Sequence, residues 1–204
     1  MLLNDRRSRT LAVLFLNCLL AACTHNLDVP KIPISTFPQK EKIALVLGLE
    51  LNNEVRTAQS VLTRSVDTWI FPLGENLCLN SELLARALFS DVTLVDDNST
   101  KASVDAILVP KFISSVQSLS VFPFPFERKM TVVLEWSLKD PTGNVIWIDT
   151  ITGEGRLTDY EAFNYTGNRR RLFEAMLSDL FHRSYETISS SLAIRKFAAK
   201  KASN

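Results

Sequence analysis

Residues 127–157, ERKMTVVLEWSLKDPTGNVIWIDTITGEGRL, contain the pattern that decides the fold. The five residues DPTGN, 140–144, place proline at the second position of a turn and glycine at the fourth, which is typical of a hairpin connection. The run NVIWIDTITGEGRL, 144–157, is then the partner strand, so the stretch predicts a long antiparallel hairpin. Before the turn, apolar residues alternate, and the residues predicted to share one face are Met130, Val132, Leu134, Trp136 and Leu138.

A long amphipathic helix is predicted after the hairpin, from about residue 168 to residue 199. Its apolar residues recur at steps of three and four, as in a helix with one buried face. This pattern favours a core helix packed across the sheet, and a coiled-coil partner is the less favoured alternative because the pattern lasts only about three heptads. The apolar positions are Leu172, Phe173, Met176, Leu177, Leu180, Phe181, Tyr185, Ile188 and Leu192.

The residues before the hairpin predict the remaining strands of one sheet. KIALVLGLEL, 42–51, is an aliphatic run typical of a central strand. Residues 52–71 favour neither the helical nor the strand period, so a short helix and a second strand both remain open. A helix that includes residues 81–90 and stops at Asp91 is predicted next. Two strands follow, over residues 92–97 and 104–121, and Pro110 is expected to interrupt the second. The predicted fold class is α/β (α+β): a single mixed sheet with a long antiparallel hairpin and a long C-terminal helix packed on one face.

Three stretches of this region carry a resemblance to known proteins. TWIFPLGENL, 68–77, VDAILVPKF, 104–112, and LKDPTGNVIW, 138–147, resemble stretches of periplasmic envelope-assembly lipoproteins with a TolB amino-terminal-domain-like α/β fold, including peptidoglycan-synthase activator lipoproteins. The resemblance implies an α/β domain within residues 42–194. It transfers no functional residue to this chain.

The N-terminal residues predict a lipoprotein signal peptide. Three arginines in MLLNDRRSRT precede the apolar run LAVLFLNCLL, 11–20, which has the length of a secretory signal and is well short of the ~20 residues that cross a bilayer. Leu20-Ala21-Ala22-Cys23 then resembles the lipobox of bacterial lipoprotein precursors. The resemblance implies cleavage between Ala22 and Cys23 and acylation of Cys23, and a short buried helix over 11–22 is the alternative interpretation. Thr24 stands where an aspartate commonly marks inner-membrane retention in that family, which favours the outer membrane facing the periplasm.

The predicted domain organisation follows from this signal. Residues 1–22 are the signal peptide, residues 23–41 are a tether rich in proline, residues 42–199 are the α/β domain and residues 200–204 are a basic tail. Prolines at this density favour an extended spacer of ~3 Å per residue, which would hold the domain some tens of ångströms from the membrane.

Charge and cysteine usage agree with an envelope protein. The whole chain has 23 basic and 22 acidic residues, and removal of residues 1–22 leaves 20 and 21, a formal charge of about −1. This balance gives no reason to expect nucleic acid as a partner. Cys18 leaves with the signal and Cys23 is acylated, so Cys78 alone keeps its thiol, and its apolar neighbours predict a core position.

No arrangement of residues in the sequence points to catalysis, and we expect no enzyme activity, cofactor or metal. His25 lies in the predicted tether. His182 shares a helix edge with Asp179 and Glu186, and surface ion pairing accounts for this spacing as well as a metal site would. There is no G-x-S-x-G elbow to support a hydrolase. Gly153 and Gly155 lack the third glycine of a phosphate loop and are interpreted as a strand end or bulge.

Two stretches are candidates for contact with a partner. In SVFPFPFERK, 120–129, the phenylalanine ribbon (Phe122, Phe124 and Phe126) alternates with prolines that prevent full pairing in a sheet, and Arg128 follows it. These rings cover the domain's own core, or they contact a partner or a membrane surface. The second stretch, Asn168-Arg169-Arg170-Arg171, places three cations at a helix start, where a solvated run is favoured over an anionic partner.

The sequence therefore supports two hypotheses of function. The first is a non-enzymatic outer-membrane lipoprotein that serves as an accessory or assembly factor of an envelope complex, membrane-bound through its N-terminal lipid and with a protein partner in the envelope. The alternative is an auxiliary lipoprotein or carrier for lipid or hydrophobic small-molecule transport. In the second hypothesis a cleft between the sheet and the long helix would hold the ligand.

Overall fold

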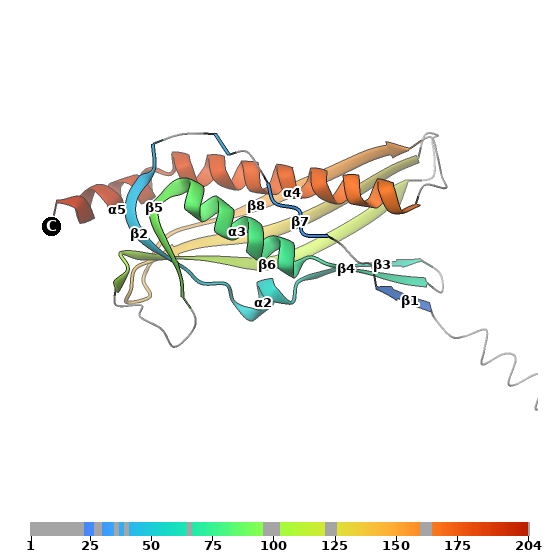
Figure 1. Cartoon of the computed structure of the whole chain (residues 1–204), viewed down its shortest axis with the longest axis horizontal. Helices are drawn as coiled ribbons and strands as arrows, with labels where there is room; N and C mark the ends of the chain where they lie inside the picture. The colour runs from blue at the N-terminus through green and yellow to red at the C-terminus, as the bar shows by residue number, and fades with distance from the viewer. Residues whose placement is uncertain are drawn as a thin grey trace, which may run out of the picture.

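A computed structural model of the chain describes residues 23–26, 30–34, 37–38, 41–64, 67–95, 103–120, 126–159 and 165–203. The strands are β1 (Cys23–Asn26), β2 (Ile43–Leu49), β3 (Gln59–Arg64), β4 (Asp67–Pro72), β5 (Phe89–Leu94), β6 (Ala106–Ser120), β7 (Phe126–Lys139) and β8 (Val145–Asp159). The helices are α2 (Asn53–Arg56), α3 (Gly74–Leu88), α4 (Tyr165–Ser190) and α5 (Leu192–Ala202), with the labels of Figure 1.

The strands form two sheets, so the prediction of a single sheet is wrong. The larger sheet has the order β5-β2-β6-β7-β8, in which β2 runs parallel to β5 and β6, and β7 runs antiparallel to β6 and β8. The smaller sheet has the order β1-β4-β3. It arises because the ambiguous segment 52–71 forms α2 and then nearly all of the β3–β4 hairpin, and because residues 23–26, expected in a tether, pair with β4.

The predicted long hairpin is confirmed. β7 and β8 pair from Phe126↔Asp159 to Lys139↔Val145, and the alternate apolar residues of β7 are buried as expected. The Asp140 carboxylate accepts hydrogen bonds from the backbone and hydroxyl of Thr142 and from the backbone and amide of Asn144, and these bonds lower its pKa to about 2. Gly143 adopts a positive φ of 94°, which completes the turn.

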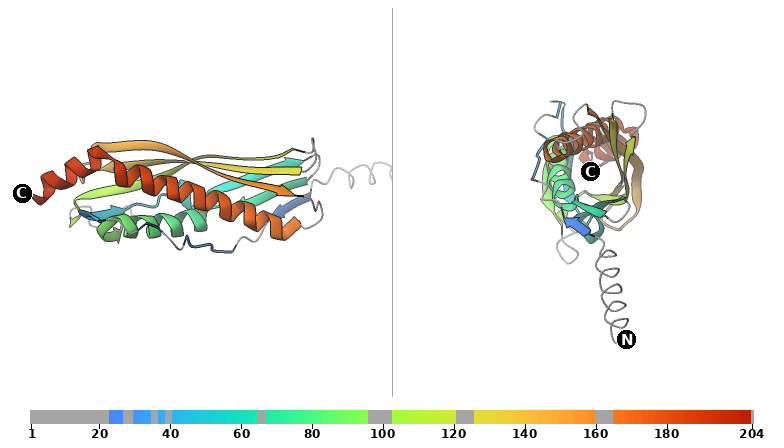
Figure 2. Two further views of the ribbon diagram at one scale, coloured as in Figure 1. Left: turned by 90° about the horizontal axis from the view of Figure 1, so that it is seen from above. Right: turned by 90° about the vertical axis from the view of Figure 1, so that its right-hand side faces the viewer.

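The core lies between the larger sheet and the helices α3 and α4, as Figures 1 and 2 show. The predicted central strand β2 is confirmed by its parallel neighbours on both sides and by the burial of Leu45, Leu47 and Leu49. Trp136 of β7 is fully buried, and its indole N–H donates to Ser184 of α4 at 3.0 Å. Pro110 does not interrupt β6, and it lies two residues beyond Leu108, the last residue of β6 that pairs with β2.

The predicted C-terminal helix is two helices. α4 ends at Ser190, whose hydroxyl donates to the carbonyl of Glu186 at 2.8 Å, and α5 begins after Ser191, whose hydroxyl accepts from the Ile194 N–H at 3.4 Å. Serine hydroxyls compete with helical backbone bonds and cap helix starts, which explains the break in this serine run. α5 continues through Ala202, so Lys200 and Lys201 belong to the helix.

Gly153 and Gly155 lie inside β8 and not at a strand end or a bulge. They let α4 approach the sheet: a Cβ on Gly153 would stand 2.3 Å from Leu180 Cβ, and one on Gly155 would stand 2.3 Å from the Leu172 carbonyl oxygen. Helix and sheet are therefore in direct contact here. This contact leaves no room at these positions for the cleft between the sheet and the long helix that the carrier hypothesis uses.

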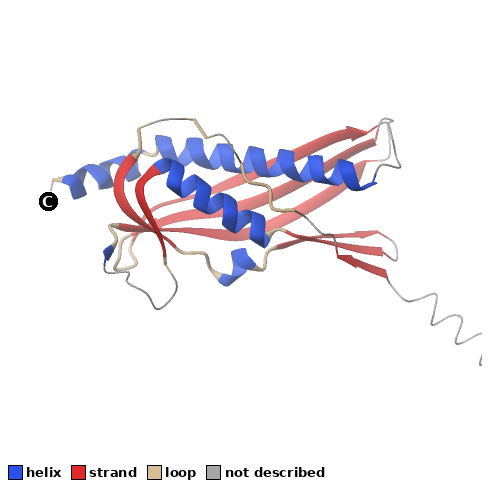
Figure 3. Ribbon diagram, viewed as in Figure 1, coloured by secondary structure: helices blue, strands red, loops and turns tan. Residues whose placement is uncertain are grey.

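The molecule is elongated, with different elements at its two ends (Figures 1 and 2). We call one of them the Cys23 end, where β1, β7 and α4 begin and where β3, β6 and β8 end. The opposite end carries α5 and the turn between β7 and β8 (Figure 3). No helix among the described residues has the length and apolarity needed to cross a membrane.

Candidate functional site

Strand β1 begins at Cys23, the predicted acylation site. Residues 23–26 run parallel to β4 with the register Cys23↔Asp67, Thr24↔Thr68, His25↔Trp69 and Asn26↔Ile70. Ala22, on the other side of the predicted cleavage site, lies outside the described residues. The first residue of the predicted mature chain is thus also the first residue of a strand.

Two buried asparagines of α3 hold the next described part of the predicted tether. Asn76 accepts from the Ile32 N–H at 2.7 Å and donates to the Pro30 carbonyl at 3.2 Å. Asn80 accepts from the Ile34 N–H at 2.8 Å and donates to the Ile32 carbonyl at 2.9 Å. Because the two amides stand one helical turn apart, they match the two-residue repeat of an extended chain, and the segment 30–34 is fastened to α3.

A third attachment lies on α4. The Tyr185 hydroxyl donates to the Pro38 carbonyl at 2.6 Å, and the Phe37 ring stacks on the Tyr185 ring at a centroid distance of 5.5 Å. Ile32, Ile34 and Phe37 are partly buried against the core. The described residues of 30–38 therefore pack on the domain and do not form a free spacer.

A cluster of rings and one cation lies beside β1. His25 stacks on Trp69 with 4.2 Å between ring centroids, and the Arg169 guanidinium carbon stands 3.9 Å from the Trp69 centroid and 5.7 Å from that of Phe71. Arg169 is only 8% exposed, so the interpretation of residues 169–171 as a solvated run is wrong for this residue. Cation–π contact with the tryptophan compensates part of the cost of burying the charge. Arg170 forms an ion pair with Glu174 at 2.8 Å, and Arg171 is exposed.

The predicted contact residues belong to the connection between β6 and β7 and to the start of β7. Phe122 and Phe124 lie outside the described residues, and Phe126 is the first residue of β7, paired with Asp159. Arg128 is half-buried two residues further on. Because β6 ends and β7 begins at the Cys23 end, the structure places the flanks of the phenylalanine ribbon at the same end as the predicted acylation site (Figure 1).

The face of β7 and β8 near this end carries a group of paired charges. Glu154 contacts both Lys129 and Arg156, and hydrogen bonds from these two cations lower the pKa of its carboxyl. Arg156 also approaches Glu127 at 3.4 Å. The two cations and the two carboxylates of this group therefore sum to no net charge.

The helix edge with His182 is used for packing and ion pairing. His182 Nδ1 lies 2.7 Å from the Ser178 carbonyl oxygen, and its ring contacts Phe37 at 5.9 Å. Asp179 accepts from the Glu154 backbone N–H and from Arg183, each at 2.8 Å, which binds α4 to β8. Within the part of the chain that the structure describes, no group of three or more His, Cys, Asp or Glu side chains is placed to hold a metal ion.

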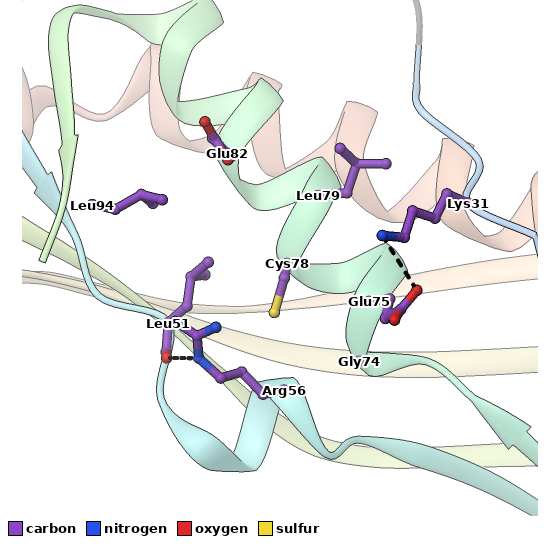
Figure 4. A pocket seen from close by; sticks show the side chains of 9 residues that line it. All are labelled: Lys31, Leu51, Arg56, Gly74, Glu75, Cys78, Leu79, Glu82 and Leu94. Carbon is purple, nitrogen blue, oxygen red and sulfur yellow. Dashed lines mark hydrogen bonds and ion pairs between the residues drawn. The ribbon is translucent and has the colours of Figure 1, made fainter. Parts of the chain in front are cut away.

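A pocket of about 370 Å³ opens between α2, α3 and β5 (Figure 4). Its lining mixes aliphatic side chains with balanced charges: Lys31 pairs with Glu75 at 3.6 Å, and Arg56 donates from Nε to the Leu51 carbonyl at 2.8 Å. The remaining lining residues are Gly74, Cys78, Leu79, Glu82 and Leu94. The volume lies at the lower end of small-molecule sites.

Cys78 borders this pocket and packs against the core as predicted, but it is half-buried and not fully enclosed. Burial raises the pKa of the thiol, and the neighbouring Arg56 cation opposes that shift in part. A raised pKa keeps the thiol protonated at neutral pH, and the protonated form is a poor nucleophile.

Alkylation kinetics test this state of Cys78. In a chain with Cys18 and Cys23 replaced by serine, we expect iodoacetamide to modify the folded protein at pH 7 several-fold more slowly than the unfolded chain. The difference should shrink as the pH rises toward the elevated folded-state pKa, because the thiolate fraction then recovers. Equal rates for folded and unfolded chains at pH 7 would contradict this prediction.

The residues that fasten the N-terminal segment were not identified from the sequence. Asn76 and Asn80 are spaced four apart on the same helix face as Leu77 and Leu84, and all four are buried. Buried side-chain amides require hydrogen-bonding partners, so a pair of asparagines on an apolar helix face is a signal for a bound backbone segment. Arg169 gives no such signal, because its partner Trp69 is a hundred residues away.

Comparison with known proteins places the architecture among solved folds. No family model and no curated protein matches the chain. The fold is shared with a protein from Xanthomonas campestris of the family DUF330, at 11% identity and a TM-score of 0.52 over 89% of this chain and 99% of that one. It is also shared with a neuraminyllactose-binding hemagglutinin homolog from Helicobacter pylori, at 9% identity and a TM-score of 0.52 over 87% and 100% of the two chains.

A minor lipoprotein from Acinetobacter baumannii is also similar, at 16% identity over 74% of this chain and 92% of that one. Its TM-score of 0.42 is too low to support an argument about a common fold. At these identities the comparisons establish the architecture, and the function has to be argued from this chain's own residues.

Proposed function

We propose that the protein is an outer-membrane-anchored periplasmic lipoprotein that acts as a non-enzymatic accessory or assembly factor of an envelope complex. The observation that carries the proposal is the position of Cys23. The lipobox-like residues 20–23 predict cleavage before Cys23, and the first described strand begins at that residue. Cleavage there would keep β1 and its pairing with β4 in the mature chain. N-acylation would convert the new amino terminus to an amide, which suits a residue that is part of a strand.

Confinement to a membrane supports the accessory role. Two proteins held on one membrane surface meet at a high effective concentration, so modest contacts are sufficient for a complex. β6 ends and β7 begins at the Cys23 end, so in the anchored protein a partner that contacts the sequence between these two strands would lie near the membrane surface. The non-enzymatic part of the proposal rests on the sequence, which contains neither a nucleophile elbow nor a phosphate loop.

Site-specific crosslinking tests the partner. A photoreactive amino acid at Phe124, in the full-length protein in a diderm bacterium, is expected to yield a discrete crosslinked protein that fractionates with the membrane. Thr142 serves as the matched control, because it is exposed in the turn at the opposite end. The accessory role would be contradicted by the absence of a protein adduct at Phe124, or by the same adducts at both positions.

The pocket beside Cys78 favours a second candidate, a carrier for lipid or a hydrophobic small molecule. Leu51, Leu79 and Leu94 give it an aliphatic part, although it lies between α2, α3 and β5 and not between the sheet and α4. Organic extraction of the purified protein, followed by mass spectrometry, distinguishes the two functions. A lipid or other apolar ligand in stoichiometric amount would support the carrier, and an extract without any stoichiometric ligand would exclude it.

A further inference from the structure

We propose that the anchored protein stands end-on on the bilayer, with the Cys23 end against the lipid headgroups and no flexible spacer between the anchor and the domain. This inference rests on the proposed acylation of Cys23, and it identifies the surface of the domain that contacts the membrane. The predicted tether would allow any orientation, whereas contacts between the domain and residues 23–26, 30–34 and 37–38 restrict how far the anchor can move from the domain.

The first step concerns the residues next to the anchor. Cys23 is itself in register with Asp67, and His25, two residues later, stacks on Trp69 at 4.2 Å. A lipid on Cys23 therefore continues directly from a paired strand. Acyl chains that enter the bilayer hold their residue at the level of the lipid headgroups. The end of β3 and the start of β4 then also lie close to the headgroups.

The second step concerns what holds β1 in place. After β1, the chain is fastened to α3 by the four hydrogen bonds of Asn76 and Asn80, and then to α4 by the bond from Tyr185 to Pro38. These attachments lie on two different helices of the core. They oppose the release of residues 23–38 as an extended linker, so the strand transmits the position of the anchor to the domain.

The third step is the length of the molecule. Trp69 pairs with His25, two residues after Cys23, so it lies roughly 7 Å from Cys23 along the strand direction. Trp147 pairs with Leu138, twelve residues along β7 from Phe126 and therefore roughly 40 Å from the Cys23 end. In the end-on orientation Trp69 is near the headgroups, and Trp147 lies far from the bilayer in the aqueous phase.

Fluorescence quenching by labelled lipid distinguishes these positions. The lipidated protein, purified from bacterial membranes, is reconstituted into phosphatidylcholine vesicles that contain a lipid with a nitroxide on its headgroup. We expect the nitroxide to quench part of the tryptophan emission, the Trp69→Phe variant to lose at least half of that quenching, and the Trp147→Phe variant to keep it. Phenylalanine retains a ring for His25 and Arg169 to contact, so the first variant is designed to fold.

A second pair of positions keeps the test independent of Trp69. In a Cys78→Ser background, a fluorophore is attached at Thr63→Cys or at Thr142→Cys, two exposed positions at the Cys23 end and at the opposite end. We expect the headgroup nitroxide to quench the first fluorophore several-fold more than the second. Equal quenching at both positions would overturn the end-on orientation and indicate a molecule lying on its side. The absence of quenching at both would indicate a domain held away from the bilayer by a spacer.

The intact mass of the same preparation separates this inference from the function on which it rests. A chain without acyl groups would overturn the proposed lipoprotein function, and the orientation with it. An acylated chain that binds vesicles would overturn the orientation alone if quenching is unchanged in Trp69→Phe and is no stronger at position 63 than at position 142.

Discussion

Gly153→Ala is expected to lower the free energy of unfolding by roughly 3 kcal/mol, the upper part of the usual range for overpacking. The new methyl group would stand 2.3 Å from Leu180 Cβ and 2.7 Å from Leu180 Cα. The Cα belongs to the backbone of α4, which cannot rotate away as a side chain can, so the helix has to move off β8. Leu180 and its neighbours Leu177 and Phe181 are fully buried, and such a movement would loosen their packing.

Thermal and chemical denaturation measure this effect. For a domain of this size the loss corresponds to a fall in melting temperature of roughly 6–12 °C. Thr152→Ala is the matched control, because this neighbour is exposed on the other face of β8, and its cost should stay below about 1 kcal/mol. Equal stabilities of the two variants would show that α4 does not contact β8 at Gly153.

The double variant Asn76→Ala with Asn80→Ala is expected to release the segment 30–34 from α3. It removes four hydrogen bonds to backbone groups, each with a net contribution of about 1 kcal/mol, and we expect a total destabilisation of roughly 2–4 kcal/mol. The partly buried Ile32 and Ile34 would lose packing when the segment separates. Each single variant should show about half of the effect, because each asparagine makes two of the bonds.

Limited proteolysis measures the release directly. Lys31 lies within the fastened segment, and trypsin needs a locally extended, accessible chain, so the double variant should be cut after Lys31 at least tenfold faster than the wild type. Asn53→Ala, an exposed asparagine of α2, is the control and should leave the rate unchanged. Wild-type cleavage rates in the double variant would show that the asparagines do not hold the segment.

The parts of the fold that follow from local sequence were predictable. The β7–β8 hairpin depends on DPTGN and on an alternating pattern, and both are readable within thirty residues. The central strand β2 and the helix α3 also follow from their own residues, although α3 ends at Leu88 rather than at residue 90, because Phe89 adopts an extended conformation and begins β5.

The parts that depend on distant partners were not predictable. β1 becomes a strand because β4, more than forty residues away, offers an edge, and in CTHN only Thr24 has a preference for strands. Glycine is required at positions 153 and 155 because α4 packs closely on β8 there. Arg169 is buried against Trp69, a residue far away in the sequence. The proline-rich composition of residues 23–41 predicts extended chain, but it does not reveal the amides of α3 that bind residues 30–34.

Intact mass, combined with separation of inner and outer membranes, tests the lipoprotein proposal most directly when wild type is compared with Cys23→Ser in a diderm bacterium. We predict a wild-type chain that begins at Cys23, is heavier by its acyl groups and fractionates with the outer membrane, and a variant that lacks the acyl mass and leaves that membrane. A wild-type chain that keeps residues 1–22, or that begins at Cys23 without added mass, would contradict the proposed anchor.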